Sequence, residues 1–171
     1  MEWFTAVVKS LLDASVRFVV IGVGGANFYA TRGSQSFFTR DRDLFLPLDP
    51  DNEMRAWAAC ESHGLELWLG DEPLGQPRNR WLAERIVERR IVTTATDRKE
   101  RIIDLSLTMA DFDFETVWEE RRTFLSEGVP IPVARLTHIV DSKRTAGRQK
   151  DLNFLITHEQ ALRDLLRRDE E

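Results

Sequence analysis

The chain has 171 residues, of which 42% are hydrophobic and 31% are charged, and its formal net charge is −5. These values are typical of one ordinary globular domain and exclude a disordered chain. An acidic chain is not drawn to nucleic acid as a whole, so any polyanion would need a local basic patch. No apolar run approaches the roughly 20 residues that cross a bilayer, which predicts a cytoplasmic protein without a membrane segment.

Metal-binding or disulfide chemistry based on cysteine is excluded by composition. Cys60 is the only cysteine, so neither an internal disulfide nor a cysteine zinc site can form. His63, His138 and His158 are scattered without the spacing of metal ligands. We interpret all three as ordinary surface or partly buried histidines.

The first part of the chain predicts helix, strand, helix, strand and helix in that order. Apolar residues recur at helical spacing in 2–14, and "RFVVIG" (17–22) has the β-branched composition of a buried strand. The glycine-rich segment 22–33 then predicts a short helix, and residues 41–46 the next strand. "DPDNEMRAWAACESHG" (49–64) predicts a helix that is capped by Asp49 or Asp51 and ends at Gly64.

The remaining elements follow without a repeat or a linker. Strands are expected at 65–69, 89–96 and 101–107, with an irregular connection at 69–79 and a helix at 81–87. A helix at 113–121, an extended "VPIPVA" (129–134) and two helices separated at Gly147 complete the chain. We therefore expect a single domain over 1–171, with a core at about 16–110 and a C-terminal part at about 111–171.

A glycine cluster follows the first predicted strand. Gly22 and Gly24 begin the spacing of a dinucleotide-binding motif, but Asn27 occupies the third glycine position, and the next acids precede their strand. That motif is therefore absent. A strand-to-helix junction with glycines still offers free backbone N–H groups and a positive helix end to a phosphate. The alternative role is a tight turn that lets helix and strand pack closely.

Three aspartates lie at or within apolar strands. Asp41 and Asp43 are two residues apart, so their side chains lie on the same side of a strand, and each raises the cost of ionising the other unless a cation lies between them. Asp104 stands inside "ERIIDLSL" (100–107), where an unpaired carboxylate is costly. The residues leave two alternatives, carboxylates at strand ends that face water or a metal site.

The order strand, glycine turn, helix, Asp-x-Asp strand and later Asp strand resembles the nucleotidyltransferase superfamily, which has the polymerase-β-like fold. "VRFVVIGVGGANFYA" (16–30) and "TRDRDLFL" (39–46) resemble the opening of small bacterial nucleotidyltransferases, including AbiEii-like toxins of toxin–antitoxin systems. "VARLTHIVDSKRTAGRQKDLNFL" (133–155) is similar to their C-terminal block. The resemblance implies an α+β fold, a mixed β-sheet with helices packed on it and a C-terminal helical segment.

The resemblance also implies a reaction, the Mg²⁺-dependent transfer of a nucleoside monophosphate from an NTP to a hydroxyl acceptor. Mn²⁺ is expected to substitute for Mg²⁺. The implied acceptor is RNA, protein or a small molecule, and an antitoxin is a candidate partner. The implied catalytic and metal-binding residues are Asp41, Asp43 and Asp104. The implied nucleotide-binding residues are Gly22, Gly24, Gly25, Lys143, Arg148, Lys150 and Asp151.

The sequence departs from the family pattern at two places. The usual adjacent Gly-Gly or Gly-Ser appears as Gly22-Val23-Gly24-Gly25, and Phe154 stands where relatives often carry a further aspartate. Two other functions are compatible with parts of the pattern. One is a catalytically inactive nucleotide-binding or partner-regulated module on the same fold, and the other is a metal-dependent glycosyltransferase that uses an Asp-x-Asp motif.

Overall fold

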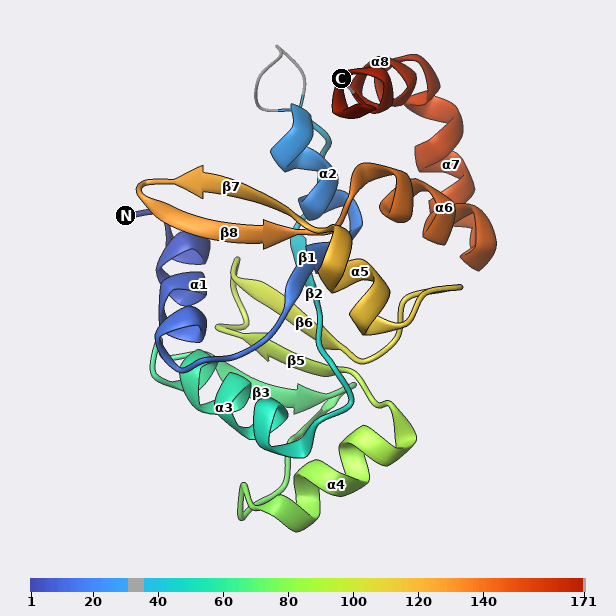
Figure 1. Ribbon diagram of the computed structural model, residues 1–171. Coiled ribbons are helices and arrows are strands. Elements are labelled where there is room, and N and C mark those ends of the chain that lie inside the picture. Colours follow the sequence, from blue (N-terminus) through green and yellow to red (C-terminus); the bar gives the residue numbers. More distant parts are fainter. Residues whose placement is uncertain (31–35, 171) are drawn as a thin grey trace.

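The computed structural model describes residues 1–30 and 36–170, and its central feature is one mixed β-sheet with helices packed on it (Figure 1). The strand order is β4-β3-β5-β6-β2-β1-β8-β7. The strands are β1 (Val19–Ile21), β2 (Asp41–Phe45), β3 (Glu66–Leu69), β4 (Glu72–Pro73), β5 (Thr93–Thr96), β6 (Ile102–Ser106), β7 (Arg122–Ser126) and β8 (Val129–Val133). This architecture confirms the predicted α+β class.

The helices lie on both faces of the sheet and at its ends. They are α1 (Trp3–Asp13), α2 (Gly22–Ala30), α3 (Pro50–Glu61), α4 (Arg80–Arg89), α5 (Phe114–Glu120), α6 (Leu136–Ala146), α7 (Gln149–Thr157) and α8 (Glu159–Glu170). Figure 1 shows α6, α7 and α8 near α2, at the opposite end of the molecule from α4. In the part of the chain that the structure describes, no helix is long and apolar enough to cross a membrane.

The pairing of the central strands brings the acidic positions together. β2 runs antiparallel to β1, which sets Ile21 opposite Asp43, and parallel to β6, which sets Asp43 opposite Asp104. β1 also pairs in parallel with β8 through Val20 and Val133. Because neighbouring strands lie about 5 Å apart, Asp43 and Asp104 are side by side on the sheet.

Alternation along the strands creates two apolar faces. Leu44 and Ile103 belong to the larger core, which packs against α1, α3 and parts of α2, α4 and α6. Val19 and Phe45 belong to a smaller core on the other face, beneath α5 and the start of α6. Since side chains two residues apart share a face, Asp43 lies on the same face as Phe45, beside this smaller core.

Local cap chemistry explains where several helices begin and end. The side chain of Asp49, rather than Asp51, caps α3 by accepting hydrogen bonds from the backbone N–H groups of Asp51 and Asn52. Gly64 has a left-handed backbone but lies two residues beyond the cap residue Ser62, so the helix ends earlier than predicted. Gly147 adopts φ +61° at the end of α6 and separates it from α7, as predicted.

The predicted strand 89–96 is wrong in its first half. Helix α4 continues to Arg89, and Arg90 closes it in a left-handed conformation with φ +53°. β5 starts only at Thr93, where its backbone can pair with both β3 and β6. The β-branched composition of 91–96 correctly indicated a strand. The end of α4 could not be predicted, because Arg90 caps the helix at positive φ, where a glycine would be expected.

Three further elements were not predicted. β7 alternates half-buried and exposed residues and forms a hairpin with β8 across Glu127 and Gly128, both at positive φ. β4 is a two-residue strand within the predicted connection 69–79. The C-terminal region contains a third helix, α8, because the chain breaks again at His158. Residues 31–33 of the predicted segment 22–33 lie outside the described residues.

Glu53 is fully buried on α3, and its ionisation is expected to destabilise the protein. Thr93 Oγ1 donates a weak hydrogen bond of 3.5 Å to Glu53 Oε1, whereas Oε2 has no partner among the described residues. Burial raises the pKa of Glu53 from 4.5 to about 7, against the opposing effect of hydrogen bonds from Thr93 and Trp57. The folded state therefore holds this proton more tightly than the unfolded state does.

We predict that the free energy of unfolding falls by about 3 kcal/mol between pH 4.5 and pH 7 because of Glu53. The raised pKa means that this stability is complete below pH 4.5 and is lost as the pH rises toward 7. Urea denaturation across this range should show a decline in Glu53→Gln that is smaller than the wild-type decline by this amount. Glu119→Gln, at an exposed position on α5, is the control. A decline of equal size in both variants would contradict the prediction.

Candidate active site

One polar cavity of about 460 Å³ collects most of the predicted site residues. It lies between the carboxylate-bearing strands and the junction of α6 and α7. Its lining includes Gly22, Asp41, Asp43, Asp104, Lys143, Arg148, Lys150 and Asp151. These residues are up to 129 positions apart in the sequence, from Gly22 to Asp151. We call this cavity the carboxylate pocket.

The three aspartates enter the pocket from two neighbouring strands. Asp41 is exposed at the start of β2, whereas Asp43 and Asp104 are half-buried in register with one another. The hydroxyl of Thr94, on the adjacent strand β5, donates a hydrogen bond of 2.7 Å to Asp104 Oδ1. This bond orients one oxygen of Asp104.

The close approach of these carboxylates makes their ionisation unfavourable. Burial, followed by the charges of Asp104 and Asp41, raises the pKa of Asp43 to about 6, although Lys143 and Lys150 oppose the rise. Burial is also the largest cause of the raised pKa of Asp104, and the hydrogen bond from Thr94 opposes it. A bound cation would relieve this repulsion.

Gly22 is the glycine that faces the carboxylates. It begins α2 with φ +69°, and a Cβ atom at this position would lie 2.5 Å from Asp43 Oδ2. Both the backbone conformation and the contact therefore require glycine. The N-terminus of α2 consequently lies directly beside the carboxylate of Asp43.

Gly24 and Gly25 serve a different purpose. A Cβ atom at Gly25 would lie 3.0 Å from both Ile139 Cδ1 and the carbonyl oxygen of Val20, so this glycine lets α2 pack closely on α6 and β1. Gly24 is buried, and a Cβ atom there would lie 3.4 Å from Arg42 Cδ. The structure places these two predicted nucleotide-binding residues in packing contacts, while Gly22 lines the pocket.

Asp151 joins two of the predicted cations. It is almost completely buried and accepts hydrogen bonds from Lys143 Nζ at 3.3 Å and from Arg148 Nε at 2.7 Å. Burial alone would raise the pKa of Asp151, but Arg148 and Lys143 outweigh it and hold the pKa below its ordinary value. The ion pairs of Asp151 are made with Lys143 and Arg148.

Phe154 packs beside the side chain of Lys143. The ammonium of Lys143 lies 5.0 Å from the centre of the Phe154 ring, within the range of a cation–π contact. Phe154 also makes an edge contact with Phe37, with ring centres 5.2 Å apart. Lys143 is thus held by the buried carboxylate of Asp151 and by the ring of Phe154.

Several polar residues of the pocket were not found from the sequence. Ser106 and Thr108 line it together with Ser142. The signal for Ser106 was present, because it follows Asp104 by two residues on the same strand and must share its face. Thr94 could be recognised only once β5 was placed beside β6.

The carboxylate oxygens of the pocket are the type of ligand that suits a hard cation. Among the described residues, no three Asp, Glu, His or Cys side chains form a ready metal-binding group. Mg²⁺ is commonly held by one or two carboxylates, with substrate phosphates and waters completing its shell. The crowded carboxylates of Asp43 and Asp104, whose pKa values are raised, fit such an ion.

No family model matches this chain, and no curated protein matches it. The function must therefore be inferred from the residues of the pocket and from their geometry.

Gly22→Ala is expected to displace the Asp43 carboxylate. The added Cβ would overlap Asp43 Oδ2 and would force an alanine to φ +69°, which together should lower the free energy of unfolding by about 1–3 kcal/mol. Thermal denaturation would measure the loss. Gly64→Ala is the matched control, because Gly64 also has positive φ but no atom lies within 4 Å of its Cβ position. Equal destabilisation by both changes would show that the contact with Asp43 has no effect.

Asp151→Asn is expected to lower stability by about 2–4 kcal/mol at pH 7, because Lys143 would lose its buried counter-charge. The lowered pKa means that the stabilisation by Asp151 exists at neutral pH and disappears as the pH falls below about 4. Urea denaturation at pH 7 and pH 3 should therefore show the two proteins converging in acid. The exposed pair Asp141–Arg144 supplies the control Asp141→Asn, with an expected change below about 0.5 kcal/mol. A similar loss in both variants would overturn this role of Asp151.

Proposed function

We propose that the protein is a Mg²⁺-dependent nucleotidyltransferase with a polymerase-β-like fold, formed by one domain over the whole chain. The observation that carries the proposal is the carboxylate pocket, in which three aspartates face a basic cluster in an otherwise acidic protein. The strand order supports it further, because β1 leads through Gly22 into α2 and then to the acidic strand β2, which pairs with β6.

The triphosphate is assigned to the side of the pocket near α6 and α7. Lys150 and Arg148 are exposed there, and Lys143 is held toward the pocket by Asp151 and Phe154. The N-terminus of α2 at Gly22 adds unpaired backbone N–H groups and the positive end of a helix dipole. These groups would bind and orient the negative charges of the β- and γ-phosphates.

The metal is assigned to the oxygens of Asp41 and Asp43, with Asp104 nearby. When bound, Mg²⁺ would neutralise phosphate charge and polarise the α-phosphoryl group. Gly22 contributes by leaving room for Asp43 Oδ2 beside the backbone. Lys143 and Lys150 balance the remaining negative charge of the carboxylates.

The chemical step is an in-line displacement at the α-phosphorus. The hydroxyl oxygen of the acceptor forms a bond to this phosphorus, the bond between phosphorus and the bridging oxygen breaks, and pyrophosphate leaves. The hydroxyl proton passes to a carboxylate oxygen of Asp104. The raised pKa of Asp104 makes this group a better proton acceptor than an ordinary aspartate, and Thr94 holds it in position.

The resemblance to AbiEii-like toxins extends the proposal to a role in a toxin–antitoxin system. It rests on the motif around Asp41 and Asp43 and on the block 133–155. The identity of a gene that neighbours the coding gene would test this extension, since a toxin should be encoded beside an antitoxin.

Transfer of label from nucleotides tests the reaction itself. The protein would be incubated with each α-labelled NTP, Mg²⁺, and either cellular RNA or cellular protein, with EDTA as a control. We expect covalent label in one acceptor fraction with the wild-type protein and no label with Asp43→Asn. Asp13→Asn, at an exposed position at the end of α1 and outside the carboxylate pocket, should retain activity. Mg²⁺-dependent NTP binding without transfer to any acceptor would instead support the inactive nucleotide-binding module.

A further inference from the structure

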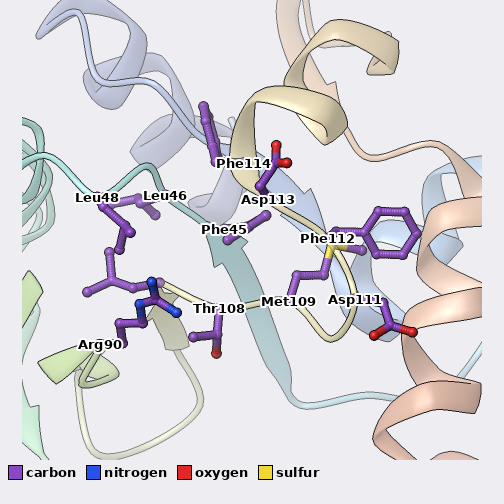
Figure 2. Close-up of a pocket in the computed structure, with 11 residues that line it drawn as sticks. Phe45, Leu46, Leu48, Arg90, Thr108, Met109, Asp111, Phe112, Asp113 and Phe114 are labelled. Atoms are coloured by element: carbon purple, nitrogen blue, oxygen red, sulfur yellow. The ribbon is translucent and has the colours of Figure 1, made fainter.

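A second cavity, of about 390 Å³, lies next to the carboxylate pocket and has a different chemistry (Figure 2). Phe45, Leu46, Leu107, Met109 and Phe114 are buried side chains in its lining, so its floor is apolar. Figure 2 shows Arg90 and Leu48 on one side of Met109, and Phe112 and Asp111 on the other. We call this cavity the apolar pocket.

The two pockets share a wall. Thr108 and Met109 line both of them. Phe45 follows Asp43 by two residues along β2, and Thr108 follows Asp104 by four residues. At about 3.3 Å per residue of extended strand, Phe45 at the near edge of the apolar pocket lies roughly 7 Å from Asp43.

Of the charged side chains that line the apolar pocket, one cation has no ion-pair partner among the described residues. Asp111 accepts a hydrogen bond of 2.7 Å from Thr145 Oγ1, and Asp113 caps α5 by accepting one of 2.8 Å from the backbone N–H of Thr116. Arg90 is exposed, and no ion pair in the described part of the chain involves it. The rim therefore carries the exposed apolar side chain of Leu48 and an unpaired guanidinium.

In-line displacement places the acceptor on the side opposite to the leaving pyrophosphate. The basic residues that would bind the triphosphate come from α6 and α7, and Asp111, which accepts a hydrogen bond from Thr145 of α6, marks the near edge of the apolar pocket. Leu48 and Arg90 lie on the other side of Met109 (Figure 2). An acceptor that approaches Asp104 from the side of Leu48 and Arg90 would pass Thr108 and Met109, which line both pockets. The rest of such an acceptor would extend over the apolar pocket.

We propose that the apolar pocket binds an apolar side chain of a protein acceptor, two to four residues from the hydroxyl that receives the nucleotide. This inference rests on the proposed nucleotidyltransferase function. The lower limit of this spacing follows from the roughly 7 Å between Asp43 and Phe45, which two residues of an extended peptide span. The upper limit lets the anchor reach past Phe45 into the cavity of about 390 Å³. An acidic residue beside the apolar anchor would pair with Arg90.

The chemistry of the surface favours a protein over RNA. A nucleic acid backbone is bound by several cations that neutralise its phosphates. Among the described residues that line the apolar pocket, by contrast, Arg90 is the one cation, and the whole chain carries a charge of −5. Buried aliphatic and aromatic groups instead match a leucine, methionine or phenylalanine side chain.

Peptides with a movable anchor test the inference. Each would carry one hydroxyl residue, serine, threonine or tyrosine in separate series, and a single leucine one to eight residues away in a glycine–glutamine background. With Mg²⁺ and NTP, kcat/KM should peak at a separation of two to four residues, at least about tenfold above the peptide without leucine. Leu48→Asp should abolish the peak. Leu125→Asp, at an exposed leucine of β7, should preserve it.

A binding measurement separates this inference from the proposed function. Fluorescence anisotropy of the labelled peptides, without nucleotide, should show weaker binding to Leu48→Asp than to the wild type or to Leu125→Asp. Equal binding to all three proteins, or a rate independent of leucine position, would overturn the inference. Efficient labelling of RNA that is unaffected by Leu48→Asp would do the same. Absence of Mg–NTP binding by calorimetry would instead overturn the nucleotidyltransferase function, whatever the peptides show.

Discussion

Asp43→Asn is expected to lower Mg²⁺-dependent nucleotide transfer by at least about 10²–10³-fold and to make the metal-free protein more stable above pH 6. The loss of activity follows because a neutral amide is a poor ligand for a hard dication and removes the charge that opposes the bound phosphates. Asp41→Asn should have an effect in the same direction. Transfer of labelled nucleotide at several Mg²⁺ concentrations measures the first expectation.

The stability of the metal-free protein provides a readout that is independent of turnover. Since the pKa of Asp43 is raised from 3.8 to about 6, the wild-type protein loses stability as the pH rises through this range. At pH 8, Asp43→Asn should therefore be more stable by up to about 3 kcal/mol. Mg²⁺ should raise the melting temperature of the wild type but not of this variant. Full activity of Asp43→Asn, or an unchanged response to Mg²⁺, would end the metal hypothesis.

Asp104→Ala is expected to lower kcat by at least about 10²-fold, the usual scale for the loss of a general base. Affinity for the Mg-nucleotide should change much less, because Asp41, Asp43 and the basic cluster supply most of the binding. A role in the transition state lowers kcat with little effect on binding of the ground state. Steady-state kinetics, together with calorimetric titration of the same folded variant with Mg-nucleotide, would measure both quantities.

Thr94→Val provides a graded comparison for Asp104. It removes the hydroxyl that donates the 2.7 Å hydrogen bond to Asp104 Oδ1 but retains a β-branched residue suited to β5. We expect a smaller decrease in kcat, about 10-fold, with unchanged nucleotide affinity. Unchanged turnover in Asp104→Ala would remove Asp104 from the site. A parallel loss of stability, affinity and turnover would indicate that its role is structural.

Elements with a strong local pattern were predictable from the sequence. The helix expected at 2–14 is α1, whose apolar residues face the larger core, and the helix expected at 113–121 is α5, which begins after its Asp113 cap. β7 was missed because it lies at an edge of the sheet and none of its five residues is fully buried, so its sequence lacks the apolar pattern of a core strand. Its strand conformation depends on pairing with β8, which is a tertiary contact.

The arrangement of the candidate site was likewise predictable only in part from the sequence. The spacing of Asp41 and Asp43 requires that both share one face of a strand, because side chains alternate with a period of two. Asp104 lies opposite Asp43 because β2 and β6 pair in parallel in this register. These two strands are distant in the chain, so their register could not be read from the local sequence. The sequence therefore indicated which carboxylates to consider, and strand pairing determined which of them are neighbours.

From the sequence alone, the α+β class, the order of the main elements and the aspartates that line the carboxylate pocket could be predicted, since each depends on periodicity or on side-chain chemistry. Only the tertiary structure decided that Gly22, rather than Gly24 or Gly25, faces Asp43, and that Asp151 pairs with Lys143 and Arg148. The physical reason is that close packing and ion pairing depend on distances between segments that the chain order leaves free, and these distances are set when helices and strands bury their apolar faces together.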